Sequence, residues 1–147
     1  MDKYEVLKHC FGHSRFRQGQ EKLVDAVLSG RDALGIMPTG GGKSLCYQIP
    51  ALLLGGITIV ISPLISLMKD QVAALKNAGI STAYINSSLT AEQLRLVYRR
   101  AREGAYKLLY VAPERLETEG FAALMQAVTV SLVAVDEAHL SLIHISE

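Results

Sequence analysis

Three consecutive glycines, Gly40 to Gly42, lie between a short apolar run and a segment with helical spacing, and Lys43 and Ser44 follow them directly. Glycines let the backbone curl so that its N–H groups point inward, and the positive end of the following helix favours a bound anion. A strand, a glycine-rich turn and a helix in this order predict a phosphate-binding loop. Lys43 is expected to reach the outer phosphates of a nucleotide, and Ser44 is expected to ligate magnesium.

The strict spacing of such loops requires a further glycine where this chain has Met37. We interpret the difference as a variant, because Gly40 to Gly42 still supply the flexible turn. The alternative is an ordinary glycine-rich turn in which Lys43 and Ser44 are merely exposed.

Short apolar runs alternate with helix-period segments along the rest of the chain, which predicts an α/β fold with a parallel sheet. The expected strands are Ala33 to Met37, Ile57 to Ile61, Thr82 to Ile85, Leu108 to Val111 and Ser131 to Val135. Two helices precede them, and the second is expected to stop at Gly30. Thr90 followed by Gln93 has the spacing of a capping box. Pro63 and Pro113 are each expected to begin a helix, because proline suits the first helical turn.

Composition sets further limits. With 147 residues, 50% of them hydrophobic and 20% charged, the chain has the size and composition of one globular domain. Its net charge of +1 means that a nucleic acid would have to bind a local basic strip. Cys10 and Cys46 have neither zinc-site nor disulfide spacing. The apolar stretch Ile49 to Ile61 is too short for a bilayer, so we expect a cytoplasmic protein with no membrane association, nucleoid-associated if bacterial.

Two adjacent acids, Asp136 and Glu137, end the last apolar run before His139. Ligands gather at the carboxyl ends of strands in open α/β sheets. Asp136 is expected to hold magnesium, and Glu137 is expected to orient or deprotonate the attacking water. An acidic pair alone is usually a solvated strand end. In a chain that also contains a predicted phosphate-binding loop, the pair indicates nucleotide hydrolysis.

Four strings occur in the order of a known family: MPTGGGKS, ISPLISLMKDQ, YVAPERL and DEAH. From about Tyr4 to His139 the chain resembles RecQ-type superfamily 2 helicases. The resemblance implies a RecA-like P-loop NTPase domain, α/β with a mostly parallel sheet that is incomplete at its C-terminal side. It also implies ATP and Mg²⁺ as cofactors, DNA as partner, and 3′-to-5′ unwinding coupled to ATP hydrolysis. The expected parts are N-terminal helices (1–31), a partial first motor domain (32–139) and a tail (140–147).

The resemblance assigns roles to individual residues. The string FRQGQ, which begins at Phe16, resembles the family's adenine-recognition motif, so Gln20 would bind the adenine edge, Arg17 would contact the nucleotide, and His13 would stack on the base. A simply exposed His13 and a surface position for Gln20 are the alternatives. The catalytic residues would be Lys43, Asp136 and Glu137, and the metal ligands Ser44 and Asp136. The nucleotide would be held by His13, Arg17, Gln20, Pro38, Thr39, Gly40, Gly41, Gly42, Lys43 and Ser44.

For DNA, the resemblance points to the turns after the second, third and fourth strands. The residues expected to contact phosphates there are Ser62, Pro63, Ser66, Asn86, Ser87, Pro113 and Arg115. The alternative is that these serines and prolines only cap helices. Arg95, Arg99, Arg100 and Arg102 are interpreted as a solvated helix face. Cys46 and Tyr47 are expected to be packing residues.

After His139 the resemblance ends. The string LSLIHISE also resembles the in-frame translation of a transposon-end adapter used in sequencing libraries, so we expect residues 140–147 to be a non-native tail. The family's next strand would lie between the phosphate-loop strand and the acid-bearing strand. Without it the sheet would have unpaired backbone groups and the chain marginal stability and a tendency to aggregate, unless Leu140 to Ile145 takes its place.

Two other functions remain open. Because a second motor domain normally supplies an arginine to the transferred phosphate, hydrolysis by this chain alone is expected to be near background. It would then act as a nucleotide-binding or DNA-binding module without turnover. The other alternative is a DEAH-type ATPase that acts on RNA.

Overall fold

The computed structural model describes residues 1–30, 33–36, 44–136 and 140–144, and it describes the side chains of 1–30 and 44–136. The helices are α1 (Lys3–Phe11), α2 (Gln20–Leu28), α3 (Leu45–Leu53), α4 (Ile65–Asn77), α5 (Ala91–Arg102), the 3₁₀ turn η1 (Pro113–Arg115) and α6 (Glu119–Ala127). The strands are β1 (Ala33–Ile36), β2 (Ile57–Ile61), β3 (Thr82–Ile85), β4 (Leu108–Val111), β5 (Val130–Asp136) and β6 (Leu140–His144).

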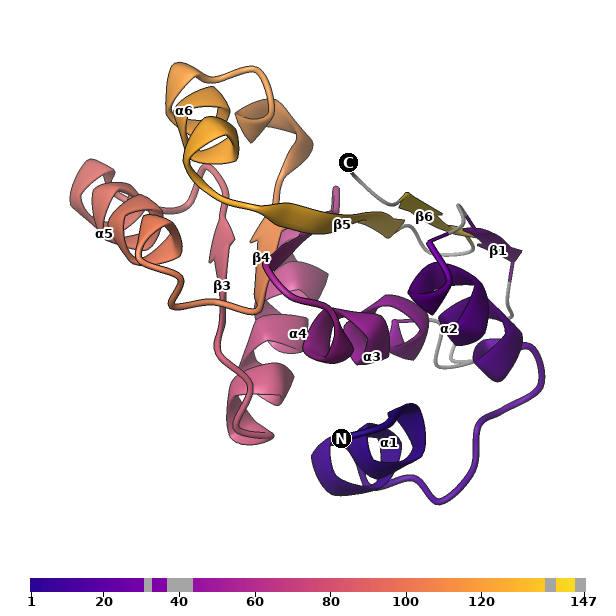
Figure 1. Ribbon diagram of the computed structural model, residues 1–147. Coiled ribbons are helices and arrows are strands. Elements are labelled where there is room, and N and C mark those ends of the chain that lie inside the picture. The colour runs from indigo at the N-terminus through magenta and orange to yellow at the C-terminus, as the bar shows by residue number, and fades with distance from the viewer. Residues whose placement is uncertain (31–32, 37–43, 137–139, 145–147) are drawn as a thin grey trace.

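Within the described part of the chain the strands form one sheet in the order β1-β6-β5-β2-β4-β3 (Figure 1). Neighbouring strands from β5 to β3 run parallel to one another. The α/β class and the mostly parallel sheet are therefore confirmed. Because parallel strands begin and end at common edges, the carboxyl ends of β2, β4 and β5 lie along one edge of the sheet, where the site is expected.

The position between β1 and β5 is occupied by β6. This strand runs antiparallel to both neighbours and pairs Leu142 with Leu34 on one side and with Val135 on the other. Among the described residues the sheet therefore has no gap between β1 and β5, and the alternative in which residues from Leu140 onward fill that position is the arrangement observed.

Helices cover both faces of the sheet (Figure 1). On one face α3 and α4 pack against strand residues such as Val60 and Ala134, together with α2. On the other face α5 and α6 pack against residues such as Ile59 and Leu109. The exposure of β5 alternates along its length, and Leu132, Ala134 and Asp136 are its buried positions. Leu132 and Ala134 lie on the face of the sheet that α3 and α4 cover. Because successive side chains of a strand point to opposite faces, Asp136 lies on the same face as these two residues.

Most expected elements match the observed ones. The bounds predicted for β2, β3 and β4 are those of the structure, and β5 extends one residue further at each end. The capping box is confirmed, since the Thr90 side chain accepts from the Gln93 N–H and the Gln93 side chain accepts from the Thr90 N–H.

The prediction for the two prolines is wrong. Pro63 precedes the N-cap of α4, which is Leu64, and therefore lies before the helix. Pro113 begins only the three-residue turn η1, and α6 starts at Glu119 after a Thr118 cap that accepts from the Phe121 N–H. At the start of α6 the Thr118 side chain satisfies one of the free N–H groups of the first turn, as residues preferred at the N-cap do.

No helix in the described ranges is both long and apolar enough to cross a lipid bilayer.

Candidate nucleotide-binding site

The helix α3 follows the predicted phosphate-binding loop, and Ser44 occupies its N-cap position with helical backbone angles. Its side chain makes no capping hydrogen bond to the first turn of α3, so among the described residues this turn leaves the hydroxyl unused. The Ser44 carbonyl accepts from the Gln48 N–H at 3.0 Å. Met37 and the predicted phosphate-binding residues Pro38, Thr39, Gly40, Gly41, Gly42 and Lys43 lie outside the described residues.

The acid-bearing strand β5 ends at Asp136, whose side chain is only 2% exposed. A carboxylate is costly to bury unless a partner compensates for the lost water. The second acid of the adjacent pair, Glu137, lies outside the described residues, as does His139.

A hydrogen bond joins the start of α3 to the end of β5. The hydroxyl of Tyr47 lies 2.7 Å from Oδ2 of Asp136, and Tyr47 itself is fully buried. Tyr47 is in the first turn of α3, three positions after Ser44. The predicted metal ligands Ser44 and Asp136 therefore belong to segments that meet at one end of the sheet, although no contact between these two side chains is seen.

Further polar groups surround the Tyr47 hydroxyl, of which Gln71 is half-buried and the others are buried. It lies 3.1 Å from the hydroxyl of Tyr110 on β4 and 2.9 Å from Oε1 of Gln71 on α4. Nε2 of Gln48 donates to the Tyr110 hydroxyl at 3.0 Å. The two tyrosine rings meet edge to face with centroids 6.4 Å apart. We call Tyr47, Gln48, Gln71, Tyr110 and Asp136 the tyrosine cluster.

Burial sets the protonation of this cluster. Loss of solvation, the Tyr110 hydroxyl and the Asp136 carboxylate hold the pKa of Tyr47 well above its usual value. Burial also raises the pKa of Tyr110 to about 12. Both hydroxyls therefore keep their protons at neutral pH and are available as donors. Burial likewise raises the pKa of Cys46 to about 11, which makes this thiol a packing residue, as expected, and not a nucleophile.

The predicted adenine-recognition residues lie at the start of α2. Gly19, with φ of 86°, turns the chain into the helix, a conformation that favours glycine. Gln20 is 1% exposed, and its Oε1 accepts from the Arg17 N–H at 2.6 Å. The alternative of a surface position for Gln20 is therefore wrong. Arg17 and His13 are exposed.

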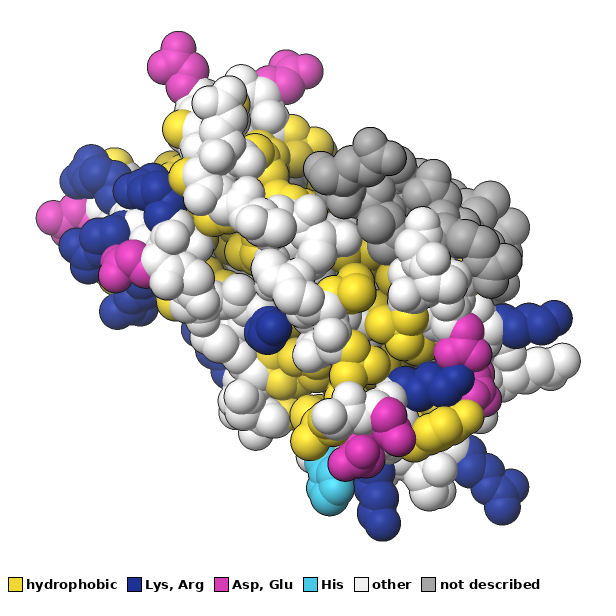
Figure 2. Space-filling model, viewed as in Figure 1, with side chains coloured by type: hydrophobic (Ala, Val, Ile, Leu, Met, Phe, Trp, Pro, Cys, Tyr) yellow, Lys and Arg dark blue, Asp and Glu magenta, His cyan; other side chains and the backbone are white. Residues whose placement is uncertain are grey.

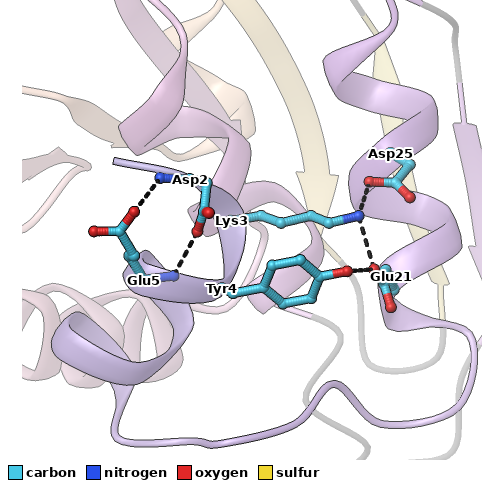
Figure 3. A network of polar contacts seen from close by, with 6 residues as sticks. All are labelled: Asp2, Lys3, Tyr4, Glu5, Glu21 and Asp25. Carbon is cyan, nitrogen blue, oxygen red and sulfur yellow. Dashed lines mark hydrogen bonds and ion pairs between the residues drawn. The ribbon is translucent and has the colours of Figure 1, made fainter.

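A polar network fastens α1 to the helix that carries Gln20 (Figure 3). Nζ of Lys3 lies 2.8 Å from Oε2 of Glu21 and also pairs with Asp25, and the Tyr4 hydroxyl donates to Glu21. Beneath these contacts, Val6 and Leu7 of α1 pack with α2 and with Ile49 of α3. The start of α2 thus lies between α1 and α3, the helix that follows the predicted phosphate-binding loop.

The residues predicted to contact DNA differ in exposure. Pro63, Ser66, Ser87 and Pro113 are exposed, Arg115 is half-buried, and Ser62 and Asn86 are only 1% exposed. Asn86 uses its side chain inside the turn, where Oδ1 accepts from the Ser88 N–H at 2.8 Å and from its hydroxyl. The exposed members are therefore the ones able to meet a phosphate, while Asn86 shapes the turn that presents Ser87.

The arginines of α5 lie away from the candidate site. Arg95, Arg99, Arg100 and Arg102 are exposed, and Figure 2 shows Lys and Arg side chains gathered over this helix. Arg99 pairs with Glu103 at 3.7 Å in a geometry open to water. Because α5 covers the face of the sheet opposite Tyr47, the observed position agrees with a solvated helix face.

Sequence reasoning missed the hydrogen-bonding role of Tyr47 and the other tyrosine-cluster members, Gln48, Gln71 and Tyr110. Its interpretation of Tyr47 as a packing residue is correct for the ring and incomplete for the hydroxyl. One signal was present: Gln48 is a polar residue inside the otherwise apolar segment LCYQIPALL, and buried polar groups require partners. In the described parts of the chain, no group of three or more His, Cys, Asp or Glu side chains is placed to hold a metal ion.

Comparison with known proteins agrees with this arrangement. A family model of DEAD/DEAH box helicases matches residues 17–144. The ATP-dependent DNA helicase RecQ of Bacillus subtilis is 54% identical over 135 residues, which are 91% of this chain and 23% of that protein. The RecQ helicase of Haemophilus influenzae is 54% identical over 134 residues, 91% of this chain and 22% of that protein. An ATP-dependent DNA helicase Q-like protein of Arabidopsis thaliana is 42% identical over 142 residues. The chain thus spans less than a quarter of the length of these relatives.

Proposed function

This chain belongs to the DEAD/DEAH box helicase family, and from that membership we propose that it forms the nucleotide-binding part of an ATP-driven DNA helicase of the RecQ type. The observation that carries the proposal is the hydrogen bond between Tyr47 and Asp136. It joins the turn that follows the phosphate-binding loop to the acid of the DEAH string. A convergence of these two segments is what nucleotide hydrolysis requires.

Magnesium is part of the proposal, and the chemistry of the available groups fits it. Mg²⁺ prefers oxygen ligands and is usually held by one or two protein oxygens together with substrate phosphates. Asp136 offers a buried carboxylate, and Ser44 offers a hydroxyl that the first turn of α3 does not use. When bound, the ion would neutralise charge on the outer phosphates. A site of two protein oxygens does not need a cluster of three acids.

The other roles follow the sequence motifs. Lys43 would contact the outer phosphates, Glu137 would orient the attacking water, and Gln20 would recognise adenine. DNA would be contacted by the exposed turn residues Ser66 and Ser87, and movement from 3′ to 5′ is proposed from the resemblance to RecQ helicases. The stimulating arginine and the second motor domain would come from outside these residues.

A chimera tests this function. Residues 1–139 of this chain replace the matching N-terminal segment of the Bacillus subtilis RecQ protein, and phosphate release is measured with no nucleic acid, with single-stranded DNA and with RNA. The proposal requires stimulation by DNA well above that by RNA. It also requires unwinding of a partial duplex with a 3′ overhang in preference to a 5′ overhang.

Other outcomes contradict the proposal in distinguishable ways. Stronger stimulation by RNA would identify an RNA-acting ATPase. Binding of an ATP analogue by the 147-residue chain without phosphate release in the chimera would identify a nucleotide-binding module. Failure of the chimera to fold is detected by circular dichroism, and the analogue-binding measurement on the 147-residue chain then decides whether a nucleotide site exists.

A further inference from the structure

The Tyr47 hydroxyl meets more acceptors than it has protons. Among the described residues it lies within hydrogen-bond distance of Asp136, Tyr110 and Gln71. A tyrosine hydroxyl carries one proton and accepts through its remaining lone pairs, whereas a carboxylate only accepts. The contact to Asp136 is the shortest of the three, at 2.7 Å, and hydrogen bonds to an ionised acceptor are the stronger ones. The proton of Tyr47 therefore points to Oδ2 of Asp136.

The other members of the tyrosine cluster then fit one consistent order of donors. Gln48 donates to Tyr110 at 3.0 Å, and Tyr110 donates to Tyr47 at 3.1 Å. The amide of Gln71 contacts the same oxygen, and a half rotation of that amide presents its Nε2 as a donor. With the Gln71 amide rotated in this way, Tyr47 receives hydrogen bonds from α4 and β4 and donates one to Asp136.

From this geometry we infer that Tyr47 is a positioning residue for Asp136, holding the carboxylate in the orientation in which it ligates Mg²⁺. The inference rests on the proposed function, because it takes Asp136 as a metal ligand. Outer groups that hydrogen-bond a ligating carboxylate fix its rotation, and their loss typically weakens metal binding by about 10-fold to 100-fold. A bond formed by a fully buried, aromatic side chain is well suited to this task, because the ring has no freedom to swing away.

The substitution Tyr47→Phe tests the inference, because it removes the hydroxyl and keeps the ring. Tyr98→Phe is the matched control: this hydroxyl is also buried, has no partner among the described residues, and lies on the opposite face of the sheet. Tyr110→Phe removes a neighbour of Tyr47 without touching Asp136. Each 147-residue variant is titrated with Mn²⁺ in the presence of ADP, and free Mn²⁺ is followed by electron paramagnetic resonance, a readout that is independent of hydrolysis.

We expect Tyr47→Phe to raise the Mn²⁺ dissociation constant by about 10-fold, Tyr110→Phe by less, and Tyr98→Phe not at all. Equal affinities for Tyr47→Phe and Tyr98→Phe would overturn the inference. Asp136→Asn distinguishes failure of the positioning role of Tyr47 from failure of the metal site at Asp136. If it abolishes Mn²⁺ binding while Tyr47→Phe has no effect, only the positioning role fails. If it has no effect, or if the unaltered chain binds no Mn²⁺, the proposed metal site fails as well.

A thermodynamic cycle excludes a merely structural explanation. The melting temperatures of Tyr47→Phe, Asp136→Asn and the double variant are compared with that of the unaltered chain. Direct contact requires the two substitutions to be non-additive. Additive losses would show that Tyr47 and Asp136 act separately and would overturn the inference even if Mn²⁺ affinity fell.

Discussion

The hydroxyl of Tyr47 donates to Oδ2 of Asp136 at 2.7 Å, although the two residues are 89 positions apart in the chain. Both are almost fully buried, so the bond forms where water cannot replace either partner. A buried hydrogen bond to a charged group contributes more to stability than one between neutral groups.

The first prediction concerns this bond. Tyr47→Phe should lower the free energy of unfolding by about 1.5 to 3 kcal/mol, the usual contribution of a hydrogen bond to a charged group. Tyr98→Phe should change it by less than about 0.5 kcal/mol, because that hydroxyl has no partner among the described residues. Urea unfolding at neutral pH measures both. A similar loss in the two variants would contradict the prediction.

A second prediction uses two buried threonines. Oγ1 of Thr82 donates to the Leu108 carbonyl at 3.0 Å, whereas Oγ1 of Thr58 has no partner in the part of the chain that the structure describes. Thr82→Val should therefore cost about 1 kcal/mol, and Thr58→Val should be neutral or stabilising, because it removes a buried group without a hydrogen bond. Urea denaturation measures the free energy of unfolding of both variants. An equal decrease in the two would refute the prediction.

The third prediction concerns Gly56, which has φ of 80° and precedes β2. A Cβ at this position would lie 2.4 Å from the Thr129 carbonyl oxygen, which also accepts from the Ile57 N–H. Gly56→Ala should therefore destabilise the chain by more than about 2 kcal/mol. The added Cβ strains the backbone of residue 56 and pushes it away from the Thr129 carbonyl.

Two other glycines serve as controls for Gly56. Gly104 also has a positive φ, of 79°, but has no atom near its added Cβ, so Gly104→Ala reports the cost of the backbone conformation alone. Gly55 has neither feature, and Gly55→Ala should be neutral. Thermal unfolding that ranks the three variants in any other order would count against steric contact at Gly56.

The fourth prediction concerns pH and the contacts in Figure 3. Hydrogen bonds from Lys3 and Tyr4 lower the pKa of Glu21 below its ordinary value of 4.5. The stability that Glu21 contributes is therefore fully present above pH 4.5 and is lost as the pH falls below it. Asp25 and Glu21 raise the pKa of Lys3, so the contribution of Lys3 persists until the solution is strongly alkaline.

Measurement of urea midpoints between about pH 6 and pH 3 tests this sign. The decline should be shallower in Lys3→Met, because the carboxylate has then lost its main partner in the folded state. Other acids titrate in the same range, so the comparison lies in the difference between the two curves. Parallel curves would mean that the network of Figure 3 contributes nothing to stability.

The fifth prediction concerns the proposed phosphate-binding loop. In the chimera with the Bacillus subtilis RecQ protein, Lys43→Ala should abolish ATP-driven unwinding, because it removes the cation proposed to contact the outer phosphates. Lys107→Ala is a suitable control, since Lys107 lies at the amino end of β4, away from the site, and its Nζ contacts the Leu54 carbonyl. Retained unwinding in Lys43→Ala would remove the main support for the site.

The strands of this fold were predictable for a physical reason. β2, β3 and β4 are short, mostly apolar runs, and β2 and β4 are buried along almost their whole length. Such runs suit strands covered on both faces. The helix starts at Pro63 and Pro113 were misplaced, because a proline permits a first turn without requiring one, whereas Thr118 supplies an acceptor for it.

The candidate site was predictable in part. Ser44 and Asp136 belong to the strings MPTGGGKS and DEAH, from which their roles were predicted. The segments that contain them meet through the hydrogen bond between Tyr47 and Asp136. The tyrosine cluster was not predictable, because the partners of Tyr47 are 24, 63 and 89 positions distant and a tyrosine in an apolar helix looks like a packing residue. The role of the Asn86 side chain inside its own turn was also not predictable, because no periodic pattern in the sequence indicates such a contact.

The separation between Tyr47 and Asp136 has a consequence for the order of folding. The central strand β2 pairs with β4 and β5, which follow it by about a third and about half of the chain, so both pairings must close long loops before their contacts form. During synthesis, α3 and α4 emerge from the ribosome well before β5. Until β5 docks, the Tyr47 hydroxyl lacks the carboxylate to which it donates, so the tyrosine cluster is among the last parts of the molecule to form.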